Sequence, residues 1–324
     1  MLIIVEGPDG AGKTRLCDEL EVRIRTRFHA IDSVVRISAG PPTRHPLDEY
    51  ELSLLPYRPT DRYVICDRWH IGEYVYPAVL GRCTSWNAAV GRHISMFLRS
   101  RGALVVLLNP PMQTLVDRVN LRGDDLVHVN QLAEISARYA SLPIELRPDL
   151  RYEYSSPNAD TVINTAMFAE STAFPLSQFV TYVGPPRPQL LLLGDTRGTD
   201  DARARLSRDP ESLAARVNRR SPAFMPYPST CGAFMLQYLG TSDVGLANAC
   251  DVDDPALLVK VLKPERVVTL GRNAHRRLNE LGVPHGTVPH PQYIRRFHHH
   301  AGLQYAQLID VAANGRKDML SWRP

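Results

Sequence analysis

Residues 7–14 read GPDGAGKT, a glycine-rich turn that strongly restricts the choice of fold. An apolar segment of strand type, Leu2–Glu6, precedes the turn, and a segment with helical periodicity begins at Thr14. The glycines let backbone N–H groups turn inwards onto an anion, and the start of the helix adds positive potential there. This strand–turn–helix unit predicts an α/β domain whose first strand ends at a phosphate site.

Every fixed position of the pattern GxxxxGK(S/T) is filled, which predicts ATP and Mg²⁺ as cofactors. Lys13 is expected to place its charge between the β- and γ-phosphates, and Thr14 to ligate Mg²⁺. Lys13 is also the only lysine in the first 259 residues of an arginine-rich chain, which indicates a role that arginine cannot fill. The predicted cofactor-binding residues are Gly7, Asp9, Gly10, Ala11, Gly12, Lys13 and Thr14.

Two further clusters complete the candidate catalytic set of Lys13, Asp67, Arg68, Arg118 and Arg122. Asp67 and Arg68 end the buried strand Tyr63–Asp67, where α/β sheets bind ligands. Asp67 is expected to act on Mg²⁺, and Arg68 to hold an acceptor phosphate, although an ion pair that only ends the strand is the simpler alternative. Arg118 and Arg122 share one helix face, and arginines that close over phosphates neutralise charge in phosphoryl transfer; a solvated helix face is the alternative.

Strand-like and helix-like segments alternate along both halves of the chain, which predicts parallel sheets covered by helices. Four prolines follow Ala173 within residues 173–189 and indicate a boundary, so we expect domains at 1–174 and 175–324. Further strands are expected at 103–109, 189–195, 245–250, 266–271 and 285–291. Further helices are expected at 14–28, 111–121, 130–140, 255–262 and 272–281.

Composition limits the classes of protein to which the chain can belong. No apolar run approaches the about 18 residues of a membrane span, and no basic leader precedes Leu2, so a soluble, cytoplasmic protein is expected. Five cysteines without a CxxC pair argue against a disulfide framework and against a cysteine-based metal site. Residues 1–179 hold 19 Lys and Arg against 21 Asp and Glu, whereas residues 180–324 hold 19 against 13. The basic second half is compatible with a DNA partner.

The first 170 residues resemble the thymidylate kinase group of nucleoside monophosphate kinases. VEGPDGAGKT, the strand end CDR with Tyr76 nine residues after Asp67, LLNPPMQTLVDRVNLRG and ISARYASL carry the resemblance. It implies a P-loop kinase fold with a three-layer parallel sheet, in which Asp9 contacts a deoxyribose 3′-hydroxyl and Arg68 holds the acceptor phosphate. Tyr76 is expected to help bind the substrate, dTMP or a modified pyrimidine deoxynucleoside monophosphate, and the group implies a homodimer.

The sequence departs from that group at two places. Tyr76-Pro77 replaces the Tyr-Gln that reads the base, and residues 39–42 read AGPP where the group has Glu-Pro-Gly-Gly.

Residues 180–300 resemble the uracil-DNA glycosylase superfamily through LLLLGDTRG, LGRNAHRRL and VPHPQY, taken in this order. The resemblance implies a second α/β/α domain. In it His290 stabilises the departing base, Asp195 of the Gly194-Asp195 turn positions water, Phe224 or Tyr227 stacks on a flipped base and Asn248 reads its edge. Thr196, Arg197 and Gln292 differ from the usual motif residues, so the fold is a firmer expectation than the activity.

Three hypotheses follow. The first is a deoxynucleoside monophosphate kinase fused to a glycosylase-like, DNA- or base-binding domain, a combination that suits modified-nucleotide metabolism in a phage. The second is a kinase that phosphorylates a hydroxymethylated base within DNA, with the second domain binding DNA. The third adds glycosylase activity to the kinase. His298-His299-His300 is expected to face solvent or DNA rather than a metal, because adjacent histidines on a helix diverge.

Overall fold

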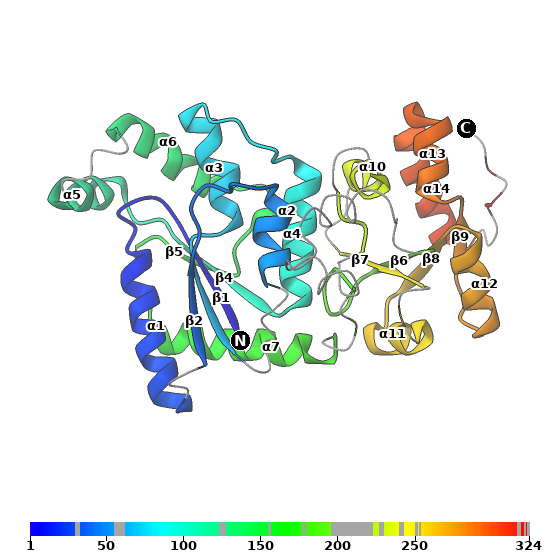
Figure 1. Ribbon diagram of the computed structural model, residues 1–324, viewed down its shortest axis with the longest axis horizontal. Coiled ribbons are helices and arrows are strands. Elements are labelled where there is room, and N and C mark those ends of the chain that lie inside the picture. Colours follow the sequence, from blue (N-terminus) through cyan, green and yellow to red (C-terminus); the bar gives the residue numbers. More distant parts are fainter. Residues whose placement is uncertain are drawn as a thin grey trace. The chain divides into compact units, whose positions relative to one another are not determined.

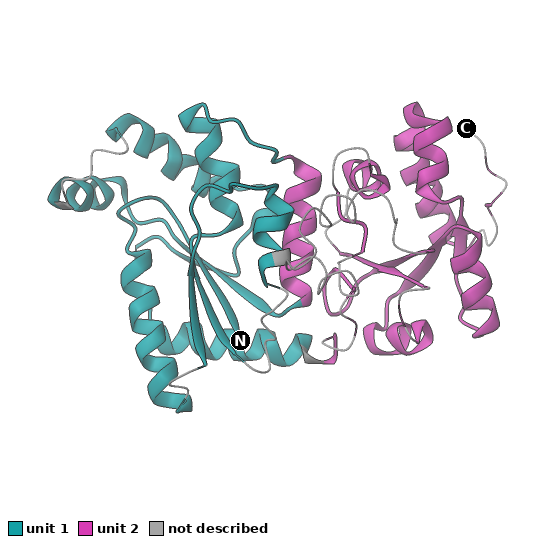
Figure 2. Ribbon diagram, viewed as in Figure 1, with its two compact units in different colours: residues 1–86, 101–174 teal, residues 87–100, 175–324 magenta. Residues whose placement is uncertain are grey.

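The protein is described from a computed structural model (Figure 1). It describes residues 1–29, 33–54, 62–122, 128–154, 157–176, 179, 181–195, 223–226, 230–239, 243–249, 252, 254–315, 319, 320 and 322, without the side chains of Leu52, Arg122 and Phe174. The chain forms two compact units (Figure 2). Unit 1 comprises residues 1–86 and 101–174, and unit 2 comprises residues 87–100 and 175–324.

Unit 1 is built on a parallel five-stranded sheet with the order β2-β3-β1-β4-β5. Its strands are β1 (Leu2–Glu6), β2 (Val34–Ser38), β3 (Tyr63–Asp67), β4 (Ala103–Leu108) and β5 (Leu150–Tyr152). The central strand β1 is buried along its whole length, as expected of a strand covered on both faces. The chain adds β2 and β3 on one side of β1, and then β4 and β5 on the other. The carboxyl end of β1 therefore lies at a topological switch point.

Helices cover both faces of this sheet. They are α1 (Lys13–Phe28), α2 (Pro46–Tyr50), α3 (His70–Leu80), α5 (Met112–Arg122), α6 (Val129–Ala140) and α7 (Ala159–Ala173). Side chains of α1 and α7 share one apolar core with Ile3 and Val106, whereas α3 and α6 share another with Leu107. Neighbouring residues of β4 thus enter opposite cores, as the pleat of a strand requires.

Unit 2 contains a second parallel sheet with the order β7-β6-β8-β9. Its strands are β6 (Leu190–Gly194), β7 (Val244–Asn248), β8 (Arg266–Leu270) and β9 (Gly286–Val288). Its helices are α4 (Ala88–Ser100), α10 (Cys231–Tyr238), α11 (Pro255–Leu262), α12 (Arg272–Glu280), α13 (Pro291–Phe297) and α14 (Gly302–Ala313). The core of α11 and α12 includes Leu191 and Leu193 of β6. The chain continues from β6 to β7 on one side and to β8 on the other, so the end of β6 is also a switch point.

The predicted α/β architecture with parallel sheets is confirmed, and every strand expected from the sequence is present, although the strand expected at 285–291 comprises only Gly286–Val288. Strand β2 was not predicted, because an arginine interrupts its short apolar run VVRIS. Helix α3 was not predicted either, because Pro77 lies inside it. In the part of the chain that the structure describes, no helix is both long and apolar enough to cross a membrane.

Candidate functional site

The glycine-rich turn connects β1 to α1 at the switch point of unit 1. Gly7, Gly10 and Gly12 all have positive φ angles, of 143°, 79° and 95°. A Cβ atom on Gly7 would lie 2.0 Å from the carbonyl oxygen of Leu108, so no side chain fits at this position. The turn therefore adopts its shape because glycine tolerates both the backbone conformation and the close approach of β4. The P-loop that the sequence predicts has the backbone that the motif requires.

Lys13 lies at the start of α1 with only 5% of its surface exposed. Its ammonium group donates hydrogen bonds to the carbonyl oxygens of Gly7, at 2.9 Å, and Pro8, at 2.7 Å. Burial, together with the nearby charge of Arg68, lowers the pKa of Lys13 to about 8, although the carboxylates of Asp9, Asp67 and Glu6 oppose the shift. The ammonium group is thus held within the loop, at the place where a phosphate would meet it.

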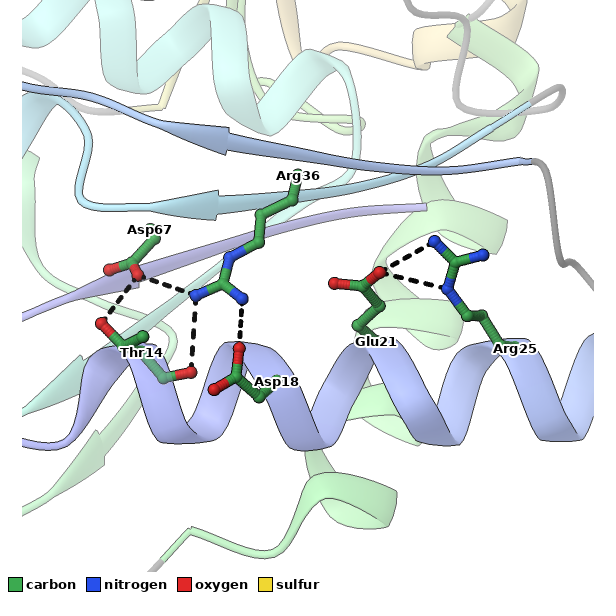
Figure 3. A network of polar contacts seen from close by, with 6 residues as sticks. All are labelled: Thr14, Asp18, Glu21, Arg25, Arg36 and Asp67. Carbon is green, nitrogen blue, oxygen red and sulfur yellow. Dashed lines mark hydrogen bonds and ion pairs between the residues drawn. The ribbon is translucent and has the colours of Figure 1, made fainter.

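Thr14 and Asp67 meet at the carboxyl end of β3 (Figure 3). The Thr14 hydroxyl donates a hydrogen bond of 3.0 Å to Oδ2 of Asp67, whose side chain is 10% exposed. Hydroxyl and carboxylate oxygens are the hard donors that Mg²⁺ prefers. The two residues predicted to hold magnesium therefore come together, and the chemistry of the pair fits that ion.

Asp9, Arg68 and Tyr76 form a second cluster beside the P-loop. Nη2 of Arg68 donates to Oδ1 of Asp9, and the Tyr76 hydroxyl donates to Oδ2 over 3.1 Å. The guanidinium carbon of Arg68 lies 6.0 Å from the centre of the Tyr76 ring. Arg68 has a left-handed φ of 68°, a costly conformation for a residue with a Cβ, and such conformations concentrate at functional sites. The three residues predicted to bind the acceptor are thus linked to one another.

Arg118 extends from α5 to the P-loop. Its Nη1 donates hydrogen bonds to the carbonyl oxygens of Gly10, at 3.1 Å, and Ala11, at 3.2 Å. The guanidinium group of this exposed residue therefore lies against the loop that is expected to enclose phosphates. The backbone of Arg122 ends α5, and its side chain lies outside the described part of the chain.

Glu6, the last residue of β1, is completely buried and was not among the predicted site residues. Its Oε1 accepts hydrogen bonds from the backbone N–H groups of Trp69, at 3.0 Å, and Ile71, at 2.9 Å. Burial raises the pKa of this carboxyl to about 7, although these hydrogen bonds and the Lys13 charge favour its ionised form. Glu6 fixes the start of α3 and with it the backbone beside Arg68. A charged residue that ends an apolar strand was the available signal.

Arg36 was also missed, because the strand that carries it was not predicted. It lies on the edge strand β2, and its guanidinium group contacts Asp67 and Asp18 (Figure 3). The site at the ends of β1 and β3 thus includes a cation in addition to Lys13, Arg68 and Arg118.

Three of the residues predicted in unit 2 gather at the end of β6. A Cβ atom on Gly194 would lie 2.4 Å from Cζ of Phe224 and 2.8 Å from Oδ1 of Asn248. Phe224 has a left-handed φ of 56°, and its side chain is nearly buried. An aromatic ring and an amide therefore both lie against a glycine at a switch point, where an open α/β sheet binds ligands.

Asp195 and His290 follow β6 and β9. Oδ1 of Asp195 accepts a hydrogen bond of 2.7 Å from the backbone N–H of Ala274, and Oδ2 accepts a 3.4 Å contact from the Asn273 amide. Asp195 thus anchors the first turn of α12. Nδ1 of His290 accepts from the N–H of Gln292 at 3.2 Å. Burial lowers the pKa of His290, which favours the neutral imidazole, and the charge of Asp195 opposes this shift.

Some of the residues singled out in unit 2 cannot be placed. Thr196, Arg197, Gly198 and Tyr227 lie outside the described residues. His298 contacts the Tyr293 ring, and His299 and His300 are exposed. Within the described ranges, no group of three or more His, Cys, Asp and Glu side chains is arranged to hold a metal ion.

Comparisons with known proteins find similarity at the level of structure alone. No family model and no curated protein sequence matches the chain. The YorR protein from Bacillus subtilis, in complex with phosphorylated GDP, matches with 18% identity and a TM-score of 0.39, over 54% of this chain and 98% of its own. Deoxyadenosine kinase from M. mycoides with dCMP and dCDP matches with 17% identity and a TM-score of 0.31, over 53% and 99%. With dATP bound, it matches with 16% identity and a TM-score of 0.30, over 52% and 98%.

Each of these matches covers about half of this chain and nearly the whole of the other protein. The resemblance of residues 180–300 to uracil-DNA glycosylases stays a prediction.

Proposed function

We propose that this protein is an ATP- and Mg²⁺-dependent phosphotransferase whose acceptor is a deoxynucleoside monophosphate. The observation that carries the proposal is the meeting of two clusters around one P-loop. Lys13, Thr14 and Asp67 form the cluster suited to ATP and its metal, and Asp9, Arg68 and Tyr76 form the cluster suited to an acceptor. A phosphate site that lacked the second cluster would suit simple nucleotide binding equally well.

The roles of the residues follow from their positions. Lys13 exchanges its bonds to the loop carbonyls for bonds to the β- and γ-phosphates, and the N–H groups of the loop add to this binding. Thr14 and Asp67 would hold Mg²⁺, which would neutralise charge on the phosphates when bound. Arg118 lies next to the loop and stabilises the charge that spreads over the transferred phosphoryl group.

The acceptor cluster supports a phosphorylated substrate. Arg68 is the cation of this cluster, and 43% of its side chain is exposed, so it can bind an acceptor phosphate in place of Asp9. Asp9 would then be available to accept a hydrogen bond from a deoxyribose 3′-hydroxyl. A free monophosphate offers both groups, whereas an internal nucleotide of DNA has its 3′-oxygen esterified. The cluster therefore favours the free nucleotide over DNA.

The decisive experiment measures ADP release from ATP and Mg²⁺ with each deoxynucleoside monophosphate, including 5-hydroxymethyl-dUMP, and with DNA that carries the same bases. Turnover with one monophosphate would support the proposal and name the base. Turnover with DNA alone would replace it with the hypothesis of a DNA kinase. Lys13→Ala should abolish turnover without unfolding the protein, and an active Lys13→Ala variant would exclude the assigned phosphate site.

We further propose that unit 2 binds a nucleobase, and that its natural ligand is DNA. The arrangement of Phe224 and Asn248 around Gly194 supports this, because a ring can stack on a base while an amide bonds to its edge. His290 follows the strand end of β9, and its neutral imidazole can donate a hydrogen bond to a base oxygen. The net positive charge of residues 180–324 would aid binding to DNA.

Glycosylase activity is the finer version of this second proposal. It requires a group that positions water. Asp195, the residue predicted for that role, instead accepts a hydrogen bond from a backbone N–H in the first turn of α12. Base binding without cleavage is therefore the better supported of the two. Incubation with DNA that contains uracil or hydroxymethyluracil, followed by alkaline cleavage at abasic sites, separates them: strand breaks would support the glycosylase.

A further inference from the structure

Arg36 joins two carboxylates from different elements of unit 1 (Figure 3). Its Nη1 contacts Asp18, one turn after Thr14 on α1, and its Nη2 lies 3.1 Å from Oδ2 of Asp67 at the end of β3. Nη2 also lies 3.5 Å from the carbonyl oxygen of Thr14. The guanidinium group therefore bridges the helix and the strand end that together carry the candidate magnesium ligands.

The atom that Arg36 contacts is the important detail. Oδ2 of Asp67 accepts both the Thr14 hydroxyl, at 3.0 Å, and Nη2 of Arg36, at 3.1 Å. The Asp67 oxygen that contacts Thr14, the other candidate magnesium ligand, is thus already paired with a cation. Since a carboxylate attracts a guanidinium group and a metal ion by the same charge, the two cations compete for Asp67.

A purely structural role explains only part of this arrangement. A charged residue on an edge strand such as β2 protects the sheet from pairing with other strands, and the exposed Asp18 is a sufficient partner for that purpose. Arg25 and Glu21, further along α1, form an ordinary surface ion pair that involves no third residue of the network in Figure 3. The contact with Asp67, whose side chain is mostly buried, is not needed for edge protection.

We propose that Arg36 is a positioning residue that acts as a tethered stand-in for the metal. Without nucleotide, it neutralises Asp67 and keeps the carboxylate directed at Thr14. On binding of nucleotide with magnesium, it releases Asp67 and stays attached to Asp18. The empty site consequently has low affinity for magnesium alone, so the metal binds together with the nucleotide phosphates. This inference rests on the proposed phosphotransferase site and adds the control of its metal requirement.

The test is a calorimetric titration of Mg²⁺ into the full-length protein saturated with ADP, which needs no acceptor and no turnover. Arg36→Gln removes the competing cation, so the half-saturating Mg²⁺ concentration should fall roughly three- to tenfold. Arg36→Lys keeps a positive charge and should stay near the wild type. Arg25→Gln removes an arginine of the same surface far from Asp67 and is the matched control, with no expected change.

Asp18→Asn provides a second variant that acts in the opposite direction. Arg36 then keeps only Asp67 as a carboxylate partner, so the half-saturating Mg²⁺ concentration should rise about two- to threefold. In the Arg36→Gln background the same change should have a smaller effect, because the competitor is already absent. This variant leaves Arg36 in place and carries the test if Arg36→Gln does not fold.

The outcomes separate this inference from the proposed function. If the wild type binds ADP with magnesium, but Arg36→Gln has an unchanged or higher Mg²⁺ requirement, the stand-in role is wrong and the phosphate site stands. If Asp18→Asn has no effect in the wild-type background, the role is wrong as well. If the wild type does not bind ADP with magnesium at all, the proposed function and this inference both fail.

Discussion

The Tyr76 hydroxyl donates a hydrogen bond to Asp9 across 67 residues of sequence, over a distance of 3.1 Å. The other oxygen of the same carboxylate accepts from Arg68. Because Asp9 belongs to the P-loop and Tyr76 to α3, this contact connects the phosphate site to the side chains proposed to bind the acceptor. The three side chains proposed to bind the acceptor are thus joined through the carboxylate of Asp9.

Tyr76→Phe should therefore weaken acceptor binding selectively. The change removes one hydrogen bond to a charged group, a loss of about 1.5 kcal/mol, so the KM for the acceptor should rise roughly tenfold. The KM for ATP should stay unchanged, because Lys13 and Thr14 keep their contacts. Steady-state kinetics with each substrate varied in turn measures both values.

Tyr74→Phe is the control for this experiment. Tyr74 is on the same helix and packs against an apolar cluster instead of Asp9. An equal increase in the acceptor KM for both variants would show that tyrosine substitutions disturb α3 generally, and would contradict a specific role for Tyr76.

Glu6→Gln should stabilise the protein at neutral pH. The pKa of Glu6 is raised from 4.5 to about 7 by burial, so the folded protein keeps a proton there that the unfolded chain has lost. The contribution of Glu6 to stability therefore falls as the pH rises from about 4.5 to about 7. Glutamine has no charge to desolvate, and its carbonyl oxygen can still accept from Trp69 and Ile71.

The free energy of unfolding, measured by urea titration, should consequently differ little between Glu6→Gln and the wild type at a pH of about 4.5. At a pH of about 7.5 it should be about 3 kcal/mol higher in the variant. Glu21→Gln makes the same chemical change at a partly exposed carboxyl of α1 that is paired with Arg25, and is the control. A variant that is less stable than the wild type at neutral pH would show that the negative charge of Glu6 is needed.

The P-loop was the part of the site most accessible from the sequence, because its glycines and lysine act through local backbone geometry. The positions of Thr14, Asp67, Asp9, Arg68 and Tyr76 were also foreseeable, since motif residues at neighbouring strand ends meet at one edge of a parallel sheet. Glu6 and Arg36 were not found, because their roles arise from tertiary contacts. Glu6 accepts hydrogen bonds from backbone N–H groups 63 and 65 residues away along the chain. Arg36 lies on a strand whose hydrophobic periodicity is too weak to predict it from the sequence.

Gly7→Ala should destabilise the fold strongly. The new methyl group would lie 2.0 Å from the Leu108 carbonyl oxygen, and backbone atoms of an interior strand such as β4 cannot move aside easily. The free energy of unfolding, measured by urea titration, should fall by about 3 kcal/mol or more, and nucleotide binding should be lost with it.

Gly81→Ala is the control that isolates the backbone contribution to this loss. Gly81 has a φ of 64°, and no heavy atom of the described residues lies within 4 Å of the place that its Cβ would take. The substitution should cost only about 1 kcal/mol. Similar losses in both variants would contradict the importance of the contact between Gly7 and β4.

Gly194→Ala tests the base-binding proposal without removing any of the side chains that are proposed to contact the base. A methyl group at this position would meet the Phe224 ring at 2.4 Å and the Asn248 amide at 2.8 Å, so the ring should shift and the space beside it should fill. Because ring and amide are side-chain groups, the fold should survive at a cost of about 1–3 kcal/mol.

Binding of the Gly194→Ala variant to DNA with a hydroxymethyluracil mismatch, measured by fluorescence anisotropy, should weaken roughly tenfold. Release of ADP with a free monophosphate, the activity proposed for unit 1, should stay unchanged. Gly282→Ala, at a position with a φ of 66° and open surroundings among the described residues of the same unit, is the control. Undiminished DNA binding by Gly194→Ala would mean that the base, if bound, lies elsewhere than against Phe224 and Asn248.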